Sequence, residues 1–262
     1  MRKDFISAIE TLGQDETSFV EAHWTKIWDR EGSERIDRVS RQEEFKMMAP
    51  YLQKLPKNSA ILDGGCGLGD WVLYLKGMGF NTTGLDISKK VIAQLQDRFP
   101  HANFRSGDIR RTEFTGDSFD LYFSWGVFEH FENGPQDCLR EAARLLRPGG
   151  LLFITVPHDN LRHSFLSAFR PFIKNSQPIR FYQYRFTRSE LMAELIAGEF
   201  DIEIIKPIHK RQGVLRFLHH SFGLPYDWLI SRALAAVISI LIPGLVISHM
   251  LFAVARKPSQ TS

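Results

Sequence analysis

The feature that most limits how this chain can fold is a glycine-rich turn directly after a short apolar strand. The segment Ile61–Gly69, ILDGGCGLG, reads as a strand end, a tight turn and the start of a helix. Glycines at such a turn adopt backbone angles that other residues avoid, and they let a ligand approach main-chain atoms closely. The turn therefore predicts a ligand site at the end of a strand, although a purely structural turn stays open on this pattern alone.

Two common uses of glycine-rich turns do not fit the spacing. A nicotinamide-dinucleotide turn has the pattern G-x-G-x-x-G, whereas the glycines here stand at 65, 67 and 69 and position 70 is Asp. A phosphate-binding P-loop needs a Lys-Ser/Thr pair, which this turn lacks. The kind of ligand must therefore be sought in the residues that follow.

Short apolar segments alternate with helical patterns after this turn. Such alternation is typical of a doubly wound α/β fold with a parallel sheet. A capping-box pattern, Thr187 followed by Glu190, predicts a further helix that ends at Gly198. The predicted strands lie at 60–63, 81–86, 102–105, 119–124, 151–156, 200–205 and 250–255, and helices at about 70–78, 88–99, 135–146 and 187–197.

The first 55 residues are expected to form an N-terminal helical cap, and residues 56–262 the domain that holds the sheet. Aromatic residues between positions 19 and 28 recur at helical spacing. Trp24 and Trp28 belong to this stripe. Two interpretations of them stay open, a lid over a bound ligand and ordinary core packing.

Two acidic residues close predicted strands. Asp86 ends the second strand, where an acid of a doubly wound sheet can accept both hydroxyls of a ribose. Asp108 ends the third strand, where a carboxylate can accept an amino group of adenine. Each alone is more often a helix cap or a solvated turn residue. Their order after the glycine turn favours a nucleoside site at the carboxyl ends of the strands.

Taken together, these segments resemble the class I S-adenosylmethionine-dependent methyltransferases. The resemblance covers roughly residues 40–206 and 248–258, with matching segments ILDGGCGLG, GLDIS, GDI, FDLYFSWGVFEHF, LRPGGLLFITVP and FAVARKP. It implies a Rossmann-like seven-stranded sheet in the order 3-2-1-4-5-7-6, with strand 7 antiparallel. It also implies S-adenosyl-L-methionine as the cofactor and no metal.

The resemblance assigns cofactor contacts residue by residue. The methionine part would lie among Asp63, Gly65, Gly67 and Gly69. The nucleoside and the reacting end would lie among Asp86 with Ile87, Asp108 with Ile109, and Ser124 with Trp125. One position departs from the family: residue 64 is Gly, where a larger residue is usual, which indicates tighter packing at this turn.

Methyl transfer to a hydroxyl would be helped by a general base, and histidine is suited to that near neutral pH. His130 and His158 follow predicted strands at the end that faces the cofactor, so both are candidate bases. The alternatives are a packing residue for His130 and a loop turn for His158. The aromatic and basic segment 181–186 is a second candidate, with Tyr182, Tyr184 and Arg185 as substrate-lining residues or as a strand that covers a sheet edge.

A helical insertion at 207–247 is expected to separate the last two strands, which the plain fold joins by a short hairpin. Residues 233–255 form an apolar segment without formal charge, and this segment is long enough for a transmembrane helix. There are two alternatives. One is a helix at about 228–242 that lies on an anionic membrane. The other is a helical cap on the core or a dimer contact. The basic residues suit the helix on an anionic membrane. The net charge of the chain is +3, and residues 206–232 alone hold five Lys and Arg against Asp227.

The sequence therefore predicts an enzyme that moves a methyl group to a small-molecule, sugar or lipid-linked acceptor, with O-methylation expected. A methyltransferase acting on RNA or protein and a non-catalytic scaffold stay open. We expect no nucleic-acid partner, and contact with an anionic membrane through 206–242 is an open alternative. Two unpaired cysteines and the lack of a signal peptide predict a cytoplasmic protein, with the inner face of the membrane as one possible place.

Overall fold

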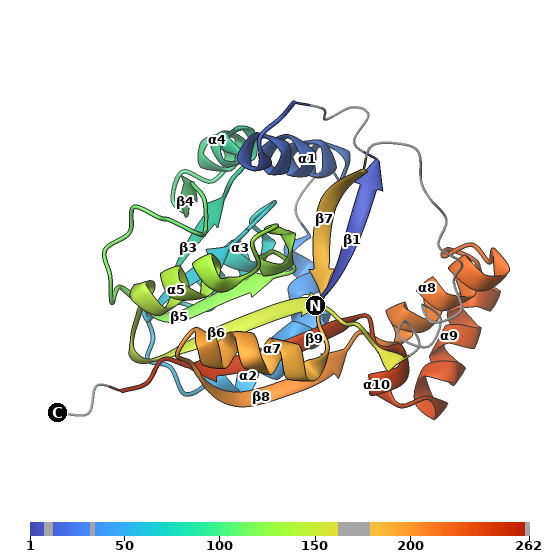
Figure 1. The fold of residues 1–262 in the computed structure, drawn as a ribbon. Coiled ribbons are helices and arrows are strands. Elements are labelled where there is room, and N and C mark those ends of the chain that lie inside the picture. Colours follow the sequence, from blue (N-terminus) through green and yellow to red (C-terminus); the bar gives the residue numbers. More distant parts are fainter. Residues whose placement is uncertain (8–12, 32–34, 162–178, 260–262) are drawn as a thin grey trace.

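The computed structural model describes residues 1–7, 13–31, 35–161 and 179–259, and a seven-stranded sheet forms its centre (Figure 1). The strands of this sheet are β2 (Ala60–Gly64), β3 (Asn81–Asp86), β4 (Asn103–Ser106), β5 (Phe119–Trp125), β6 (Leu146–Pro157), β8 (Asp201–Ile208) and β9 (Met250–Arg256). Their order is β4-β3-β2-β5-β6-β9-β8, and β9 runs antiparallel to both of its neighbours. In the order of these strands along the chain this is 3-2-1-4-5-7-6, so the predicted fold is confirmed.

Helices cover both faces of the sheet. They are α1 (Glu16–Glu31), α2 (Glu43–Leu52), α3 (Asp70–Gly77), α4 (Lys89–Arg98), α5 (Gln136–Leu145), α7 (Arg188–Ala197), α8 (Lys210–Phe222), α9 (Leu229–Leu241) and α10 (Gly244–Ile247), with short 3-10 turns η2 (Ile36–Arg41) and η3 (Phe128–His130). Neighbouring residues of a strand point to opposite faces. Leu62 accordingly packs in the cluster under α5 and α7, while Ile61 packs in the cluster under α2 and α3.

Helix boundaries follow the capping signals of the sequence. The Ser88 hydroxyl accepts a hydrogen bond from the Val91 amide at 3.4 Å and starts α4. Thr187 and Glu190 form both halves of a capping box at the start of α7. These side chains satisfy amide groups that have no partner within the first turn of a helix.

The first residues of the chain correct the prediction of an all-helical cap. Arg2–Ser7 forms a strand, β1, which pairs antiparallel with β7 (Ile179–Arg185) in a separate two-stranded sheet. An ion pair between Arg185 and Asp4, with N and O 2.8 Å apart, crosses this pairing. The short segment has no pattern that identifies its partner, because that partner stands far away in the sequence.

The insertion between β8 and β9 consists of α8, α9 and α10, as the predicted helical insertion requires. They lie beside one end of the sheet, at the right of Figure 1. The transmembrane interpretation of 233–255 is wrong, because α9 ends at Leu241 and β9 begins at Met250 inside the sheet. Among the described residues, no helix is long and apolar enough to cross a membrane.

Candidate functional site

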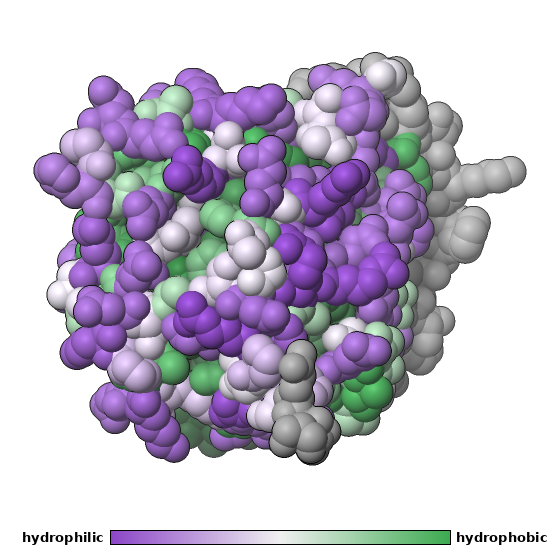
Figure 2. Space-filling model, turned by 90° about the vertical axis from the view of Figure 1, so that its left-hand side faces the viewer, coloured by the Kyte–Doolittle hydropathy of each residue, from purple (hydrophilic) through white to green (hydrophobic). Residues whose placement is uncertain are grey.

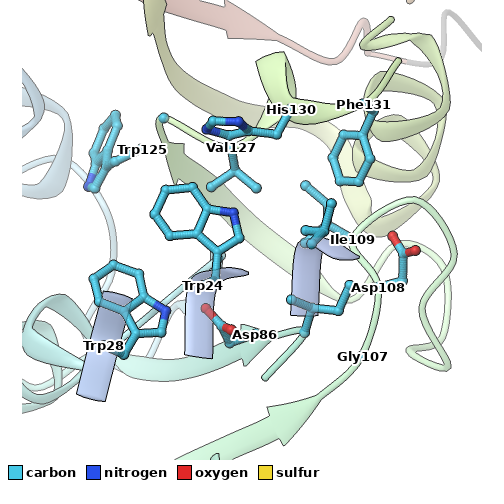
Figure 3. Close-up of a pocket in the computed structure, with 14 residues that line it drawn as sticks. Trp24, Trp28, Asp86, Gly107, Asp108, Ile109, Trp125, Val127, His130 and Phe131 are labelled. Carbon is cyan, nitrogen blue, oxygen red and sulfur yellow. The ribbon is translucent and has the colours of Figure 1, made fainter. Parts of the chain in front are cut away.

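A cavity lies at the carboxyl ends of β3, β4 and β5, with α1 across it (Figure 3). Its volume is about 80 Å³, so α1 leaves little open space above the strand ends. Aromatic and aliphatic side chains make most of its wall, and two carboxylates interrupt it. The lining residues are Val20, Trp24, Trp28, Gly65, Asp86, Ile87, Gly107, Asp108, Ile109, Trp125, Gly126, Val127, His130 and Phe131.

Helix α1 contributes the aromatic side of the cavity. Trp24 and Trp28 lie one turn apart on α1, and their rings stack with centroids 5.5 Å apart. Trp24 also meets the ring of His130 edge-on at 5.1 Å. The Trp28 ring lies so close to Gly67 that a Cβ there would stand 2.7 Å from it. The structure therefore places both tryptophans in the wall of the cavity.

The glycine turn is fixed by its own backbone and by Asp86. Gly65 and Gly67 have φ values of +88° and +49°, the region in which glycine is favoured. The Gly67 amide donates to Oδ2 of Asp86 at 2.9 Å, and the Ser88 amide donates to Oδ1 at 2.9 Å. Each carboxylate oxygen can accept a second hydrogen bond. Asp86 therefore holds the turn and keeps acceptor capacity toward the cavity.

Two buried carboxyl groups, Asp63 and Asp86, lie near each other behind the turn. Asp63 is buried, and this burial together with the nearby charges of Asp86 and Asp70 raises its pKa well above the usual range. Burial also raises the pKa of Asp86, against the effect of its two amide donors. A cation bound at this turn would relieve the repulsion between the carboxylates. The turn is thus suited to a ligand that carries positive charge.

The carboxylate of Asp108 accepts hydrogen bonds from a neighbouring residue, Arg110. Arg110 donates to Asp108 through its backbone amide at 2.9 Å and through its guanidinium at 2.7 to 3.1 Å. The same guanidinium is paired with Glu16 on α1, and Glu16 accepts from the Glu132 amide at 2.8 Å. Arg110 therefore links the third strand end of the site to the helix that covers the cavity.

Two tryptophans that line the cavity have an indole N–H group without a hydrogen-bond partner in the part of the chain that the structure describes. Nε1 of Trp28 and Nε1 of Trp125 are both buried and have no partner among the described residues. A buried donor without a partner costs free energy, so such groups usually serve a bound molecule or a water. With the carboxylate of Asp86, these donors match a ligand that carries both hydrogen-bond donors and acceptor atoms.

His130 lies at the cavity and is neutral at pH 7. Burial lowers its pKa to about 4, and a carbonyl hydrogen bond only partly opposes this effect. Its Nδ1 donates to the Tyr182 carbonyl at 2.8 Å, since a carbonyl can only accept. Its Nε2 stands 3.8 Å from Oε1 of Glu129, a buried residue whose pKa is raised to about 8 by burial. Tyr182 meets the His130 ring at 5.1 Å, so this predicted substrate residue borders the site.

Three predicted residues are not brought to the cavity. His158 is buried beyond the end of β6, where its amide donates to the His249 carbonyl at 2.9 Å and burial lowers its pKa to about 4. The Tyr184 hydroxyl donates to the Glu132 carbonyl at 2.7 Å, and Arg185 is paired with Asp4. These contacts hold the two side chains elsewhere, and neither of them lines the cavity.

The predicted cofactor residues divide into two groups. Those that line the cavity are Gly65, Asp86, Ile87, Asp108, Ile109 and Trp125. The others support it from behind. Ser124 donates to the Gly64 carbonyl at 2.5 Å, and Gly69, at φ +78°, leaves room for Phe104, whose ring would stand 2.8 Å from a Cβ there. Asp63 and Gly67 belong to this supporting group, together with Ser124 and Gly69.

Sequence reasoning missed several lining residues, namely Val20, Gly107, Gly126, Val127 and Phe131. Gly126, Val127 and Phe131 follow β5 directly, within a segment already seen to match the family. Their position after a strand end was the signal available, because parallel strands present their following loops at one edge. Val20 belongs to the stripe of α1, and nothing local distinguishes it from a core residue.

Comparisons with known proteins agree with this geometry. A family model described as "Methyltransferase domain" matches residues 62–154. A malonyl-[acyl-carrier protein] O-methyltransferase of Enterobacter lignolyticus is 29% identical over 55% of this chain and 57% of its own length. A trans-aconitate 2-methyltransferase of Deinococcus radiodurans is 36% identical over 45% of this chain and 44% of its own. The chain spans about half the length of these relatives.

A solved structure shows the same fold over nearly the whole chain. The 1,6-didemethyltoxoflavin N1-methyltransferase of Burkholderia thailandensis superposes with a TM-score of 0.57 at 17% identity, covering 98% of this chain and 96% of its own. That structure contains 1,6-didemethyltoxoflavin and S-adenosylhomocysteine. At this identity the likeness concerns the fold alone.

The sheet order and the glycine turn define a nucleoside-binding α/β protein of the Rossmann-like kind. Together with the family model that matches residues 62–154, they support the predicted resemblance to the class I S-adenosylmethionine-dependent methyltransferases. The predicted cofactor is confirmed at the level of this family, and the donors and carboxylates of the cavity fit it. Among the described residues, no group of three or more His, Cys, Asp or Glu side chains is placed to hold a metal ion.

Proposed function

We propose that this chain transfers a methyl group from S-adenosylmethionine to a small-molecule, sugar or lipid-linked acceptor within the cavity under α1. One observation carries the proposal. Asp86 is buried at a strand end, is oriented by two backbone amides, and keeps acceptor capacity toward an aromatic cavity with two unpartnered indole donors. The cofactor supplies an electrophilic methyl group on a sulfonium, and this chain's residues supply the binding and the positioning.

The residues around the cavity have separate tasks in this proposal. Asp86 and the indole Nε1 groups of Trp28 and Trp125 orient the ligand. Trp24 and Trp28 exclude water from above, because α1 lies across the opening. Holding donor and acceptor in line is worth a large factor, since effective molarities from positioning reach about 10⁵ M or more. Asp63 is buried behind the glycine turn and does not line the cavity, so its task is to support that turn.

We assign the role of general base to His130 and infer O-methylation. Its ring is neutral at pH 7, and the Nδ1 donor bond leaves Nε2 as the proton acceptor. Glu129 keeps its own proton at that pH, because its pKa is raised to about 8 by burial. His130 can therefore take the proton of an acceptor hydroxyl without competition from a neighbouring carboxylate. Removing a base of this kind usually costs about 10² to 10⁴ in rate.

The class of acceptor is supported by two further observations. Several relatives are named for small or carrier-bound acceptors, among them malonyl-[acyl-carrier protein], trans-aconitate and 2-methyl-6-phytyl-1,4-hydroquinone. The last of these names carries a phytyl chain, which favours keeping a lipid-linked acceptor in the proposal. Both cysteines, Cys66 and Cys138, are buried and unpaired, which fits the proposed cytoplasmic location.

The test is to incubate the full chain with methyl-labelled S-adenosylmethionine and a cell extract separated into small molecules, lipids, RNA and protein. We expect label in the small-molecule or lipid fraction, and at least tenfold less with His130→Asn at unchanged cofactor affinity. Label in RNA or protein alone would favour the macromolecular alternative. Absence of label in every fraction would leave the non-catalytic scaffold.

A further inference from the structure

The helices of the insertion have a small core of their own. The cluster Val214, Leu218, Ala235 and Ile247 joins α8, α9 and α10 and is buried. This core uses only one side of α9, on which Ser231 and Ala235 are buried. The other side of α9 remains for contact with something outside the described residues of this chain.

That other side of α9 is apolar and exposed. Leu229, Ile240 and Leu241 are 81%, 80% and 77% exposed. At 100° per residue the exposed apolar side chains fall within an arc of about 140°, and Arg232, the only charged residue of the helix, lies outside it. The members of this outer face are Leu229, Ile230, Ala233, Leu234, Val237, Ile240 and Leu241.

Such a face is unusual for a helix at a protein surface. Surface helices present charged and polar residues outward, and large exposed apolar patches mark sites of interaction. The side of the molecule seen in Figure 2, opposite to the insertion in Figure 1, is predominantly hydrophilic. Exposed apolar side chains on α7, such as Met192 and Ile196, form only a small pair by comparison.

Charged and aromatic residues around the outer face indicate its partner. Between positions 206 and 249 the chain has five Lys and Arg and a single acid, Asp227. The loop between α8 and α9 exposes Tyr226 and Trp228, and Phe222 is exposed at the end of α8. Aromatic side chains with a polar edge and nearby basic side chains are the combination that membrane interfaces attract.

We propose that the outer face of α9 docks on an anionic lipid bilayer, with the helix lying in the plane of the interface. The helix has 13 residues and is roughly 20 Å long, shorter than the about 30 Å of a hydrocarbon core. Its apolar side chains enter the boundary between headgroups and acyl chains. Arg211 and Arg232, both exposed, bind the anionic headgroups.

A second copy of the chain fits this face less well than a bilayer. A two-fold interface brings the same patch against itself, so basic residues would meet basic residues. With one acid in the whole insertion, there is little to compensate that repulsion. An anionic surface instead satisfies the apolar face and the basic residues together.

The insertion reaches the neighbourhood of the cavity through α8 and the start of β9. Met250, the first residue of β9 after the insertion, would stand 3.8 Å from a Cβ at Gly126 in the cavity wall. The positive charge of Arg216 on α8 acts on Tyr182, which borders the site. On the proposed function, docking would hold the cavity near the bilayer, where a lipid-linked acceptor is found. The docking itself does not depend on methyl transfer.

The test is flotation of the full chain with vesicles of phosphatidylcholine and phosphatidylglycerol, beside vesicles of phosphatidylcholine alone. We expect the protein to float with the anionic vesicles and to be released by salt, because its electrostatic part is screened. The double variant Leu229→Ser/Ile240→Ser should reduce the floated fraction at least fivefold. The matched control, Met192→Ser/Ile196→Ser on α7, should float like the unchanged chain. Both variants change exposed residues, and thermal melting checks that both remain folded.

A second pair of variants tests the charge. Arg211→Gln/Arg232→Gln should reduce binding to anionic vesicles severalfold, whereas Lys89→Gln/Arg140→Gln, the same charge change elsewhere on the surface, should not. Recovery of the unchanged chain only at the bottom with anionic vesicles would overturn the proposal. Concentration-dependent dimers in sedimentation, lost in Leu229→Ser/Ile240→Ser, would overturn it in favour of a second copy. Cofactor binding by calorimetry is measured separately, so failure of docking and failure of the proposed function are distinguishable.

Discussion

At Gly64 the backbone passes so close to Tyr122 that a side chain has no room. A Cβ there would stand 2.3 Å from the Tyr122 hydroxyl and 2.5 Å from its ring. Tyr122 is itself fully buried between strands that carry the site. The tighter packing expected from a glycine at this position is thus present, and its partner is a residue that the sequence could not identify.

This contact predicts a stability effect. Gly64→Ala should lower the free energy of unfolding by about 1 to 3 kcal/mol, as overpacking of a core does. The control is Gly77→Ala at the end of α3, where nothing lies within 4 Å of the added Cβ and where alanine should be neutral or slightly stabilising. Denaturant unfolding of both variants measures this, and equal stabilities would contradict the packing argument.

A second residue prediction concerns the unpartnered donor of Trp125. Trp125→Phe keeps most of the ring and removes Nε1, so cofactor affinity should fall about three- to tenfold, the value of one hydrogen bond. The control is Trp71→Phe, because Nε1 of Trp71 already donates to Gln42 at 3.2 Å outside the cavity. Titration calorimetry gives both affinities. A Trp125→Phe variant that binds as tightly as the unchanged chain would show that this donor serves no ligand.

At the scale of elements, α1 is the part whose role depends most on distant contacts. Its ends are tied by Glu16 to Arg110 and by Asp29 to Lys90, whose Nζ lies 2.7 Å from the Asp29 carboxylate. The first of these pairs also involves Asp108 at the site. Opening of α1 is therefore expected to be coupled to the arrangement of the third strand end.

Glu16→Gln weakens this tie while it keeps an acceptor for the Glu132 amide. Because the ion pair is partly exposed, we expect the free energy of opening α1 to fall by at most about 1 kcal/mol. Amide exchange in α1 should then become up to about fivefold faster. Asp137→Asn removes a comparable ion pair, to Arg140 on α5, and should leave α1 unchanged. Hydrogen exchange followed by mass spectrometry separates the two. Unchanged exchange in α1 for Glu16→Gln would contradict the coupling.

Elements differ in how far the sequence could predict them. The strands from β2 to β6 and the helices with Ser88 and Thr187 caps have local signals, and the structure places them as predicted. β1 has no such signal, because it is stabilised by pairing with β7. The prediction for His158 has a related explanation: His158 continues the strand pairing beyond β6, with a bridge to Phe186 and an amide that donates to the His249 carbonyl, and is therefore buried instead of lining the cavity.

At the scale of the whole molecule, buried ionisable groups make stability depend on pH. Burial raises the pKa of Glu129 from 4.5 to about 8, with His130 and Tyr182 beside it. Between these values the unfolded chain has lost the proton and the folded chain keeps it. The folded state then binds more protons, so stability falls as pH rises. His130 and His158, whose pKa values are lowered to about 4 by burial, act in the opposite direction only below about 6.5.

We therefore expect the free energy of unfolding to fall between about pH 6.5 and 8, by roughly 1 to 2 kcal/mol for Glu129. Glu129→Gln should flatten this decline, because the amide does not titrate. Asp63 and Asp86, whose pKa values are raised by burial, act in the same direction and stay in the variant. Denaturant unfolding across this range checks the slope, and an equal decline in Glu129→Gln would show that the carboxyl is not the source.

The fold also shows where the basic residues behind the net charge of +3 lie in the molecule. The excess of basic residues belongs to the insertion, which lies beside the cavity end of the sheet. Length and composition could not show this, because the antiparallel return of β9 beside β6 brings the end of the insertion to the site.

The most direct measurement is calorimetric titration of the chain with S-adenosylmethionine, alone and as Asp86→Asn. We predict saturable binding with a Kd in the micromolar range for the unchanged chain, and at least tenfold weaker binding for the variant, because the carboxylate of Asp86 both orders the glycine turn and faces the cavity. No binding up to about millimolar cofactor, or equal affinity in the variant, would contradict the assignment of this cavity as the cofactor site.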